Sequence, residues 1–341
     1  MSNFKKLKGM AGASAVAGAG LMGMMASSAR AGVNTAWTDS SSGYFTFHDA
    51  GKDWAHGFYF YGSSSTNITG INSSVTEGAI GRDVSCTDTV TTFWNCYSYS
   101  DAYDGVLGMD VNGTGFVPVF SEVVVTDYGI DAGSNVDIDT DLDASVQWAF
   151  LANAPVTRGF FSVTNKAATD AAVTISVWGD WGADGSGGII NTSSDDATVE
   201  DTDLWVTIAD DLVQGDNSDP VVTTGIAGPG STVTTTVVDI DTSNYTIDYT
   251  LDIPVGETRS IVVFHQMSKT INDAGDIEPD FESGAALNTA GLLVGLTDQQ
   301  RAQVVNYDLP NQPKKKSGGG VAGGLLGVLG LLGLARLRRR K

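Results

Sequence analysis

The chain has 341 residues, of which 42% are hydrophobic, so it is long enough and apolar enough to build a buried core, and an intrinsically disordered body is not expected. Its net charge of −21 is unevenly spread, because residues 32–313 hold all 40 acidic residues and only 7 of the 19 basic ones. A body this acidic repels nucleic acid and anionic lipid, which excludes nucleic-acid binding.

Residues 1–31 have the three-part layout of a secretory signal peptide. A basic start at 5–8 is followed by an apolar run over 10–26 and by small residues up to Ala31. The pattern predicts export through the cellular export machinery, with cleavage between Ala31 and Gly32. An uncleaved membrane anchor is the alternative, and the high content of Gly and Ala disfavours it.

Both cysteines of the chain, Cys86 and Cys96, lie in the exported body. In an oxidising compartment they are expected to form a disulfide that closes a loop of about ten residues and contributes roughly 2 to 3 kcal/mol. Two buried free thiols are the alternative. A zinc site is not expected, because the chain has only the three histidines His48, His56 and His265 to complete a set of four ligands.

The body between the two ends reads as an all-β protein. Short runs rich in β-branched and aromatic residues are separated by turn residues and show no helical period. These runs lie at 43–47, 57–61, 116–125, 146–150, 159–163, 173–178, 204–208, 233–238, 245–253 and 259–264. They predict antiparallel sheets packed face to face, as a β-sandwich. We divide the body into 32–140, with the disulfide, and 141–308, which form either two consecutive sandwiches or one large one.

Four carboxylates occupy every second position at Asp137, Asp139, Asp141 and Asp143. If they lay on one strand, all four would point to one face at a spacing of about 7 Å, where they would either face water or hold a cation such as Ca²⁺. The spacing is not that of an EF-hand. Counted from Asp137 as the first position, the sixth position of an EF-hand loop is glycine, and this chain has Leu142 there. A solvated acidic face and a calcium site both stay open.

No catalytic constellation stands out, and we expect a protein that is not an enzyme. The chain has no Gly-x-Ser-x-Gly elbow and no phosphate-binding glycine loop. The alternative is a carbohydrate-binding or carbohydrate-active protein, in which acidic loops and aromatic platforms form a cleft. The tryptophans considered as platforms are Trp54, Trp94, Trp148, Trp178, Trp181 and Trp205. Tryptophans on strands are typical of a core, and Trp181, between glycines, is the one expected at a loop surface.

One helix is predicted near the end of the body. Thr297 and Gln300 have the spacing of a capping box, and a short apolar face follows. The stretch 287–293 is a candidate second helical turn. Residues 309–317, with two prolines and three lysines, are expected to be a linker.

The C-terminal segment 318–341 predicts a transmembrane helix with a cytoplasmic stop. Residues 318–335 carry no charge, and their length of about 18 is at the lower limit for crossing a bilayer. A basic cluster follows directly, and such clusters stay on the cytoplasmic side. Its arginines are Arg336, Arg338, Arg339 and Arg340. A low-complexity tail is the alternative, because dense glycine weakens a helix.

The order of glycines, apolar segment and arginine cluster resembles the GlyGly-CTERM sorting signal of Gram-negative bacteria. The matching positions are Gly318, Gly319 and Gly320 for the recognition stretch, 321–335 for the helix and 336–341 for the basic stop. The resemblance implies a protein that is exported, anchored in the membrane by its C-terminal helix, cut by a rhomboid-type sorting protease and displayed in the cell envelope, on the outer surface or outside the cell.

The body from about 163 to 309 also resembles an uncharacterised β-rich region of exported bacterial surface proteins. The matching segments are 163–165, 195–205, 218–220, 228–230, 253–259 and 303–308. This resemblance implies location and β architecture but no activity. Together the patterns predict a surface or secreted β-sandwich protein with an attachment, envelope or extracellular-binding role, whose ligand is a glycan or another surface molecule.

Overall fold

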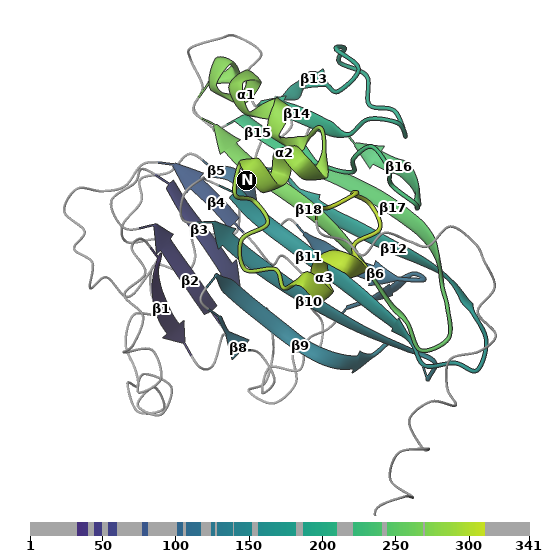
Figure 1. Cartoon of the computed structure of the whole chain (residues 1–341). Coiled ribbons are helices and arrows are strands. Elements are labelled where there is room, and N and C mark those ends of the chain that lie inside the picture. The colour runs from purple at the N-terminus through teal and green to yellow at the C-terminus, as the bar shows by residue number, and fades with distance from the viewer. Residues whose placement is uncertain are drawn as a thin grey trace, which may run out of the picture.

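The computed structural model describes the following residues: 33–39, 44–49, 54–59, 77–80, 101–104, 107–116, 124–126, 128–138, 140–151, 156–181, 187–209, 221–240, 244–268 and 270–310. Across them the chain forms three antiparallel sheets and a few short helices (Figure 1). The expected signal peptide, both cysteines and the C-terminal sorting segment lie outside the described residues. Among the described residues, none of the helices has the length and apolar composition needed to cross a bilayer.

The first sheet, here called the N-terminal sheet, is a meander in which each strand pairs with the next along the chain. Its strands are β1 (Val33–Asp39), β2 (Tyr44–Asp49), β3 (Trp54–Tyr59), β4 (Glu77–Ile80) and β5 (Asp101–Asp104).

The second sheet, the large sheet, has eight strands. In spatial order they are β13 (Gly188–Thr192), β14 (Trp205–Ala209), β15 (Val221–Gly225), β18 (Thr258–Ser268), β11 (Val156–Asn165), β10 (Leu142–Leu151), β9 (Gly129–Asp137) and β8 (Val124–Val125).

The third sheet, the small sheet, has five strands. They are β16 (Thr234–Ile240), β17 (Asn244–Ile253), β12 (Ala171–Asp180), β6 (Gly108–Val111) and β7 (Thr114–Gly115).

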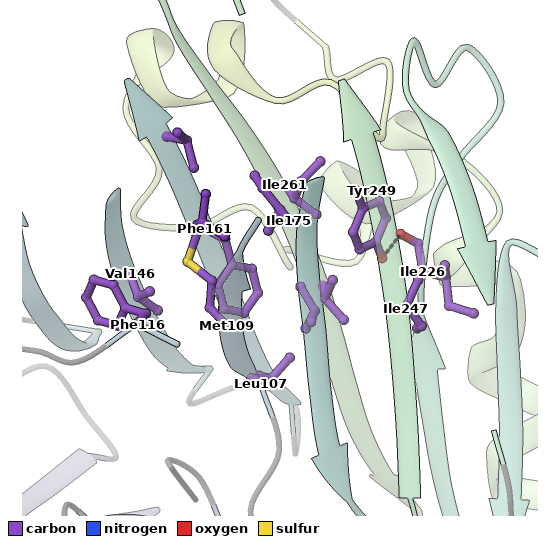
Figure 2. Close-up of a cluster of buried hydrophobic side chains, with 14 of the residues drawn as sticks. Leu107, Met109, Phe116, Val146, Phe161, Ile175, Ile226, Ile247, Tyr249 and Ile261 are labelled. Atoms are coloured by element: carbon purple, nitrogen blue, oxygen red, sulfur yellow. Dashed lines mark hydrogen bonds between the residues drawn. The ribbon is translucent and has the colours of Figure 1, made fainter. Parts of the chain in front are cut away.

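The large and small sheets pack face to face and enclose the main core, which confirms the sandwich. β12 alternates strictly, so that Val173, Ile175 and Val177 are buried while the side chains between them are not. They meet inward residues of the large sheet such as Phe161 and Ile261 (Figure 2). The Tyr249 hydroxyl, inside this core, donates to the carbonyl oxygen of Ile226 at 3.0 Å. A period of two with one apolar face is what a strand covered on one side requires.

The outer face of the large sheet is covered by residues 270–310, here called the helical cap (Figure 1). The cap contains α1 (Ile271–Ile277), the 3₁₀ helix η4 (Glu278–Phe281), α2 (Gly284–Thr289) and α3 (Asp298–Gln303). It buries a second apolar cluster around Phe160, Phe264 and Phe281. The central strands of the large sheet are therefore buried on both faces, which explains why β11 and most of β18 show no alternation of exposure.

The predicted capping box is confirmed. The Thr297 hydroxyl accepts from the Gln300 amide at 3.2 Å, and the Gln300 side chain accepts from the Thr297 amide at 2.9 Å, so both orphan groups at the start of α3 are satisfied. The stretch 287–293 contains the end of α2 and the turn that follows it. Sequence reasoning did not predict α1 or η4.

The sandwich begins before the expected division at residue 140. β9 and β10, on either side of that position, are neighbours in the large sheet, and β6 pairs with β12 in the small sheet. The described residues between 108 and 310 therefore form one sandwich with its cap. The strands that precede it form the N-terminal sheet.

Candidate functional site

The four alternating aspartates do not lie on one strand. Asp137 ends β9 and is the cross-strand partner of Asp143 in β10, because the chain reverses between them. Asp141 is exposed in the bend, and Asp139 lies outside the described residues. Aspartates favour turns because their side chains bond nearby backbone groups, and here the turn preference prevails over the alternating pattern.

Asp143 forms an ion pair with Lys166, with Oδ1 and Nζ 2.5 Å apart. The Lys166 amide also donates to the Asp141 carbonyl oxygen at 2.7 Å, which ties this bend to the end of β11. Within the described part of the chain, no three His, Cys, Asp or Glu side chains come together as a metal-binding group. The calcium site at this position stays a sequence-based expectation.

His265 lies in the centre of the sandwich and joins its two sheets. Its ring nitrogens lie 2.9 Å from the Thr224 hydroxyl and 2.8 Å from the Tyr245 hydroxyl, and Tyr245 belongs to the opposite sheet. The Leu107 amide donates to the same tyrosine oxygen at 3.0 Å. Complete burial lowers the pKa of His265 from 6.5 to about 3, so the ring is neutral and enclosed. It is a structural link between the sheets and not an accessible base.

The pKa of His265 predicts a loss of stability in mild acid. Between pH 6.5 and pH 3 the unfolded chain binds a proton at this ring and the folded chain does not, so stability falls as the pH drops through that window. Between pH 7 and pH 5 this one group is expected to lower the free energy of unfolding by about 2 kcal/mol. Urea titrations of the wild type and of His265→Gln at both pH values measure it. Equal pH dependence in the two proteins would contradict the assignment.

Two further buried polar side chains fasten the helical cap. Arg158 in β11 donates to the carbonyl oxygens of Leu292 and Val294, both at 2.8 Å. Burial, and after it the charge of Arg301, lowers the pKa of Arg158 from 12.5 to about 9. On the other side of the cap, the Thr207 hydroxyl donates to Glu278 at 2.8 Å. These contacts hold the cap on the large sheet.

The tryptophans are placed differently from the expectation. Trp181, expected at a loop surface, is 1% exposed and stacks on Tyr245 with ring centroids 4.8 Å apart. Glycine neighbours do not make a residue exposed when the segment enters the space between two sheets. Trp148 and Trp205 are buried, as expected for core residues. Trp178 is only half-buried, on the outer face of the small sheet.

Trp178 is fixed on that outer face by two neighbours in β6. A methyl group on Gly108 would come within 2.6 Å of the ring carbons Cε2 and Cζ2, so the indole lies directly over this glycine. Its Nε1 donates to Asp110 Oδ1 at 3.3 Å. The indole therefore lies against the strand with a defined orientation. The glycine at position 108 is what allows the large ring to lie this close to the backbone.

Next to Trp178, a row of polar side chains crosses four strands of the small sheet. Asp110, Ser176, Asp248 and Thr236 are successive cross-strand partners in β6, β12, β17 and β16. All four are half-buried or exposed. The Asp248 Oδ1 atom is shielded from water and has no hydrogen-bond donor among the described residues. We call Trp178, Asp110, Ser176 and Asp248 the Trp178 face, and it is our candidate site.

The Trp178 face combines an aromatic ring with two carboxylates on the outer side of the small sheet. Asp110 and Asp248 project from the same side of one sheet, with Ser176 between them. Glycoside cleavage needs two carboxyl groups on either side of the scissile bond, and here both carboxylates rise from the same face of one sheet. An aromatic ring beside hydrogen-bond acceptors suits a ligand that has both apolar and hydroxyl surfaces.

Comparison with known proteins gives no family. No protein-family model matches the chain, and no curated protein matches its sequence. Among solved structures, the heparan sulfate lyase HepC of Pedobacter heparinus is similar over 68% of this chain, with 9% identity and a TM-score of 0.34. A Klebsiella pneumoniae protein assigned as an aldose 1-epimerase is similar over 70% of this chain and 82% of its own length, with 10% identity and a TM-score of 0.36.

The chain spans 36% of the length of the lyase. Because both TM-scores are below 0.5, these likenesses carry no inference about activity or about individual residues.

Proposed function

We propose that this protein is an exported, non-enzymatic β-sandwich that is displayed at the cell surface or released, and that binds an extracellular ligand. The observation that carries the proposal is the order of its parts. A basic and apolar start precedes an acidic folded body, and an apolar segment closed by arginines follows it. Hydrophobic transfer into a bilayer, flanked by positive charge, directs such segments to membranes.

The fold supports this order because the last residues of the body before the linker are hydrogen-bonded to the large sheet. Val304 forms a parallel bridge with Ser260 beside β18, and the Val305 amide donates to the Ser260 carbonyl oxygen at 2.9 Å. Leu309 is buried in the helical cap, so the expected linker begins after residue 310, and residues 311–317 would reach about 25 Å at most when extended. A membrane-inserted tail would therefore hold the sandwich close to the bilayer until a protease releases it.

The two buried basic side chains, His265 and Arg158, are not candidates for a general acid or base. His265 and Arg158 are enclosed and committed to contacts that hold the sheets and the cap together. A general acid or base must reach its substrate within hydrogen-bond distance, and neither side chain has that access.

The test is the location of the intact chain and of a chain that ends at Ser317. We expect the intact chain in the membrane fraction, or as a surface form cut within or beside 318–320, and the shortened chain in the periplasm or medium. Mass spectrometry of the mature protein gives both new termini. A control with Arg336, Arg338, Arg339 and Arg340 replaced by glutamine keeps the apolar segment but removes the basic stop, and it is expected to anchor less well.

Intact protein found soluble in the cytoplasm, with Met1 and Lys341 both attached, would overturn the proposed function. If the shortened chain stayed membrane-bound like the intact one, the tail would not be the anchor.

A further inference from the structure

We propose that the Trp178 face binds a neutral polysaccharide made of hexopyranose rings, with one sugar ring stacked on the indole and its hydroxyl groups bonded to Asp110 and Asp248. The inference rests on the extracellular-binding role proposed above and names the ligand class and the residues. It is drawn from the arrangement of these side chains on the small sheet.

The indole of Trp178 is presented as a fixed platform. Its ring rests on Gly108, and its Nε1 is bonded to Asp110, so its orientation is set before any ligand arrives. Preorganised aromatic rings lose little conformational entropy on binding. The C–H face of a pyranose ring is flat and apolar, and it packs on such a ring while its hydroxyl groups point outward to polar neighbours.

The carboxylates supply acceptors at positions suited to those hydroxyls. Asp110 touches the edge of the indole, and Asp248 lies one strand and two residues away from Trp178, which is about 8 Å from the strand spacings. A second sugar ring in an extended chain would lie over that position. A hydroxyl of that second ring would donate to the half-buried carboxylate of Asp248.

The negative charge of the small sheet favours binding of a neutral ligand over an anionic one. The strands of the small sheet contain several aspartates and neither lysine nor arginine. The chain as a whole carries −21. Sulfated or uronic-acid polymers would be repelled, since no cation on these strands is available to pair with them.

The binding experiment uses the full chain purified in detergent and three solid polymers: microcrystalline cellulose and chitin, which are neutral, and heparin on agarose, which is anionic. Bound protein is measured against protein concentration. We expect saturable binding to a neutral polymer and none to heparin. Trp178→Ala is expected to weaken that binding tenfold or more, and Asp248→Asn threefold or more.

Two further variants distinguish a loss of binding at the Trp178 face from an effect of changed net charge elsewhere on the protein. Gly108→Ala keeps the indole but displaces it from the strand, and it is expected to weaken binding about as much as Trp178→Ala. Asp298→Asn makes the same charge change as Asp248→Asn on the exposed first turn of α3, and it is expected to bind like the wild type. Thermal melting of each variant checks that the sandwich is folded.

Folded Trp178→Ala and Gly108→Ala proteins that bind a neutral polymer as tightly as the wild type would overturn this site and leave the extracellular-binding role intact. Binding to heparin alone, or to none of the three polymers, would overturn the ligand class. Failure of the proposed function itself would be seen separately, as intact protein in the cytoplasm.

Discussion

Replacing Asn306 by alanine is expected to lower the free energy of unfolding by about 3 kcal/mol, because two backbone groups of the large sheet would be left buried without partners. Val262 in β18 has β11 on one side, where it pairs with Phe160, but β15 on the other side pairs only as far as Phe264 and leaves the Val262 amide and carbonyl without a strand partner. The Asn306 side chain takes that place. It accepts from the Val262 amide at 3.0 Å and donates to the Val262 carbonyl oxygen at 2.7 Å.

Equilibrium urea unfolding measures this effect, and Asn288→Ala is the matched control. Asn288 is exposed in α2, and its side chain bonds only that of Arg301 among the described residues, so truncating it is expected to change stability by no more than about 0.5 kcal/mol. Asn306→Asp is a sharper variant, because a carboxylate accepts from the amide but has no proton to donate to the carbonyl. If Asn306→Ala were as stable as the Asn288→Ala control, the role given to this amide would be wrong.

The second large effect is expected for Phe281→Ala, which should lower the free energy of unfolding by about 3 to 5 kcal/mol. Phe281 is completely buried in the helical cap, and its ring centroid lies 6.0 Å from that of Phe264 in β18. It also fits against Gly225, where a methyl group would come within 2.5 Å of the ring. Truncation would leave a cavity between cap and sheet that backbone and aromatic rings on both sides cannot easily fill.

Val294→Ala is the control for this truncation. Val294 is in the same cap but 41% exposed, so its truncation is expected to change stability by about 0.5 kcal/mol or less. Unfolding midpoints in urea, with the slope checked for each variant, separate the two outcomes. Similar losses for both variants would mean that the cap is not packed through Phe281.

The sequence contains a signal for the Trp178 face in the alternation of β12. In β12 the apolar residues Val173, Ile175 and Val177 alternate with polar ones, and Trp178 falls in the polar register. A tryptophan in that register points away from the core. The glycine neighbours of Trp181 favour a surface position for that residue, but it is buried against Tyr245. Register was the more reliable guide, because each strand residue is assigned to a face by the pleat itself.

The aspartates at 137–143 show where alternation along the sequence fails to predict a strand. Alternation over 137–143 suggested one strand, yet the chain turns there and brings Asp137 opposite Asp143. A strand is favoured when alternate residues are apolar and can be buried on one side. An alternation of aspartates alone provides no such apolar side, so it does not favour a strand over a turn. Likewise the partners of His265 come from β15 and β17, far along the chain, and no local pattern names them.

By itself the sequence determined the β class, the capped helix at Thr297 and, as expectations, the export and sorting signals at the two ends. These depend on local hydrophobicity, period and hydrogen-bonding groups within a few residues of one another. Only the tertiary structure decided that β6–β9 join the sandwich, that the helical cap covers the large sheet, and that Trp178 instead of Trp181 remains accessible. Those outcomes depend on which distant segments bury one another's apolar faces, and that choice is made by the packing of the whole chain.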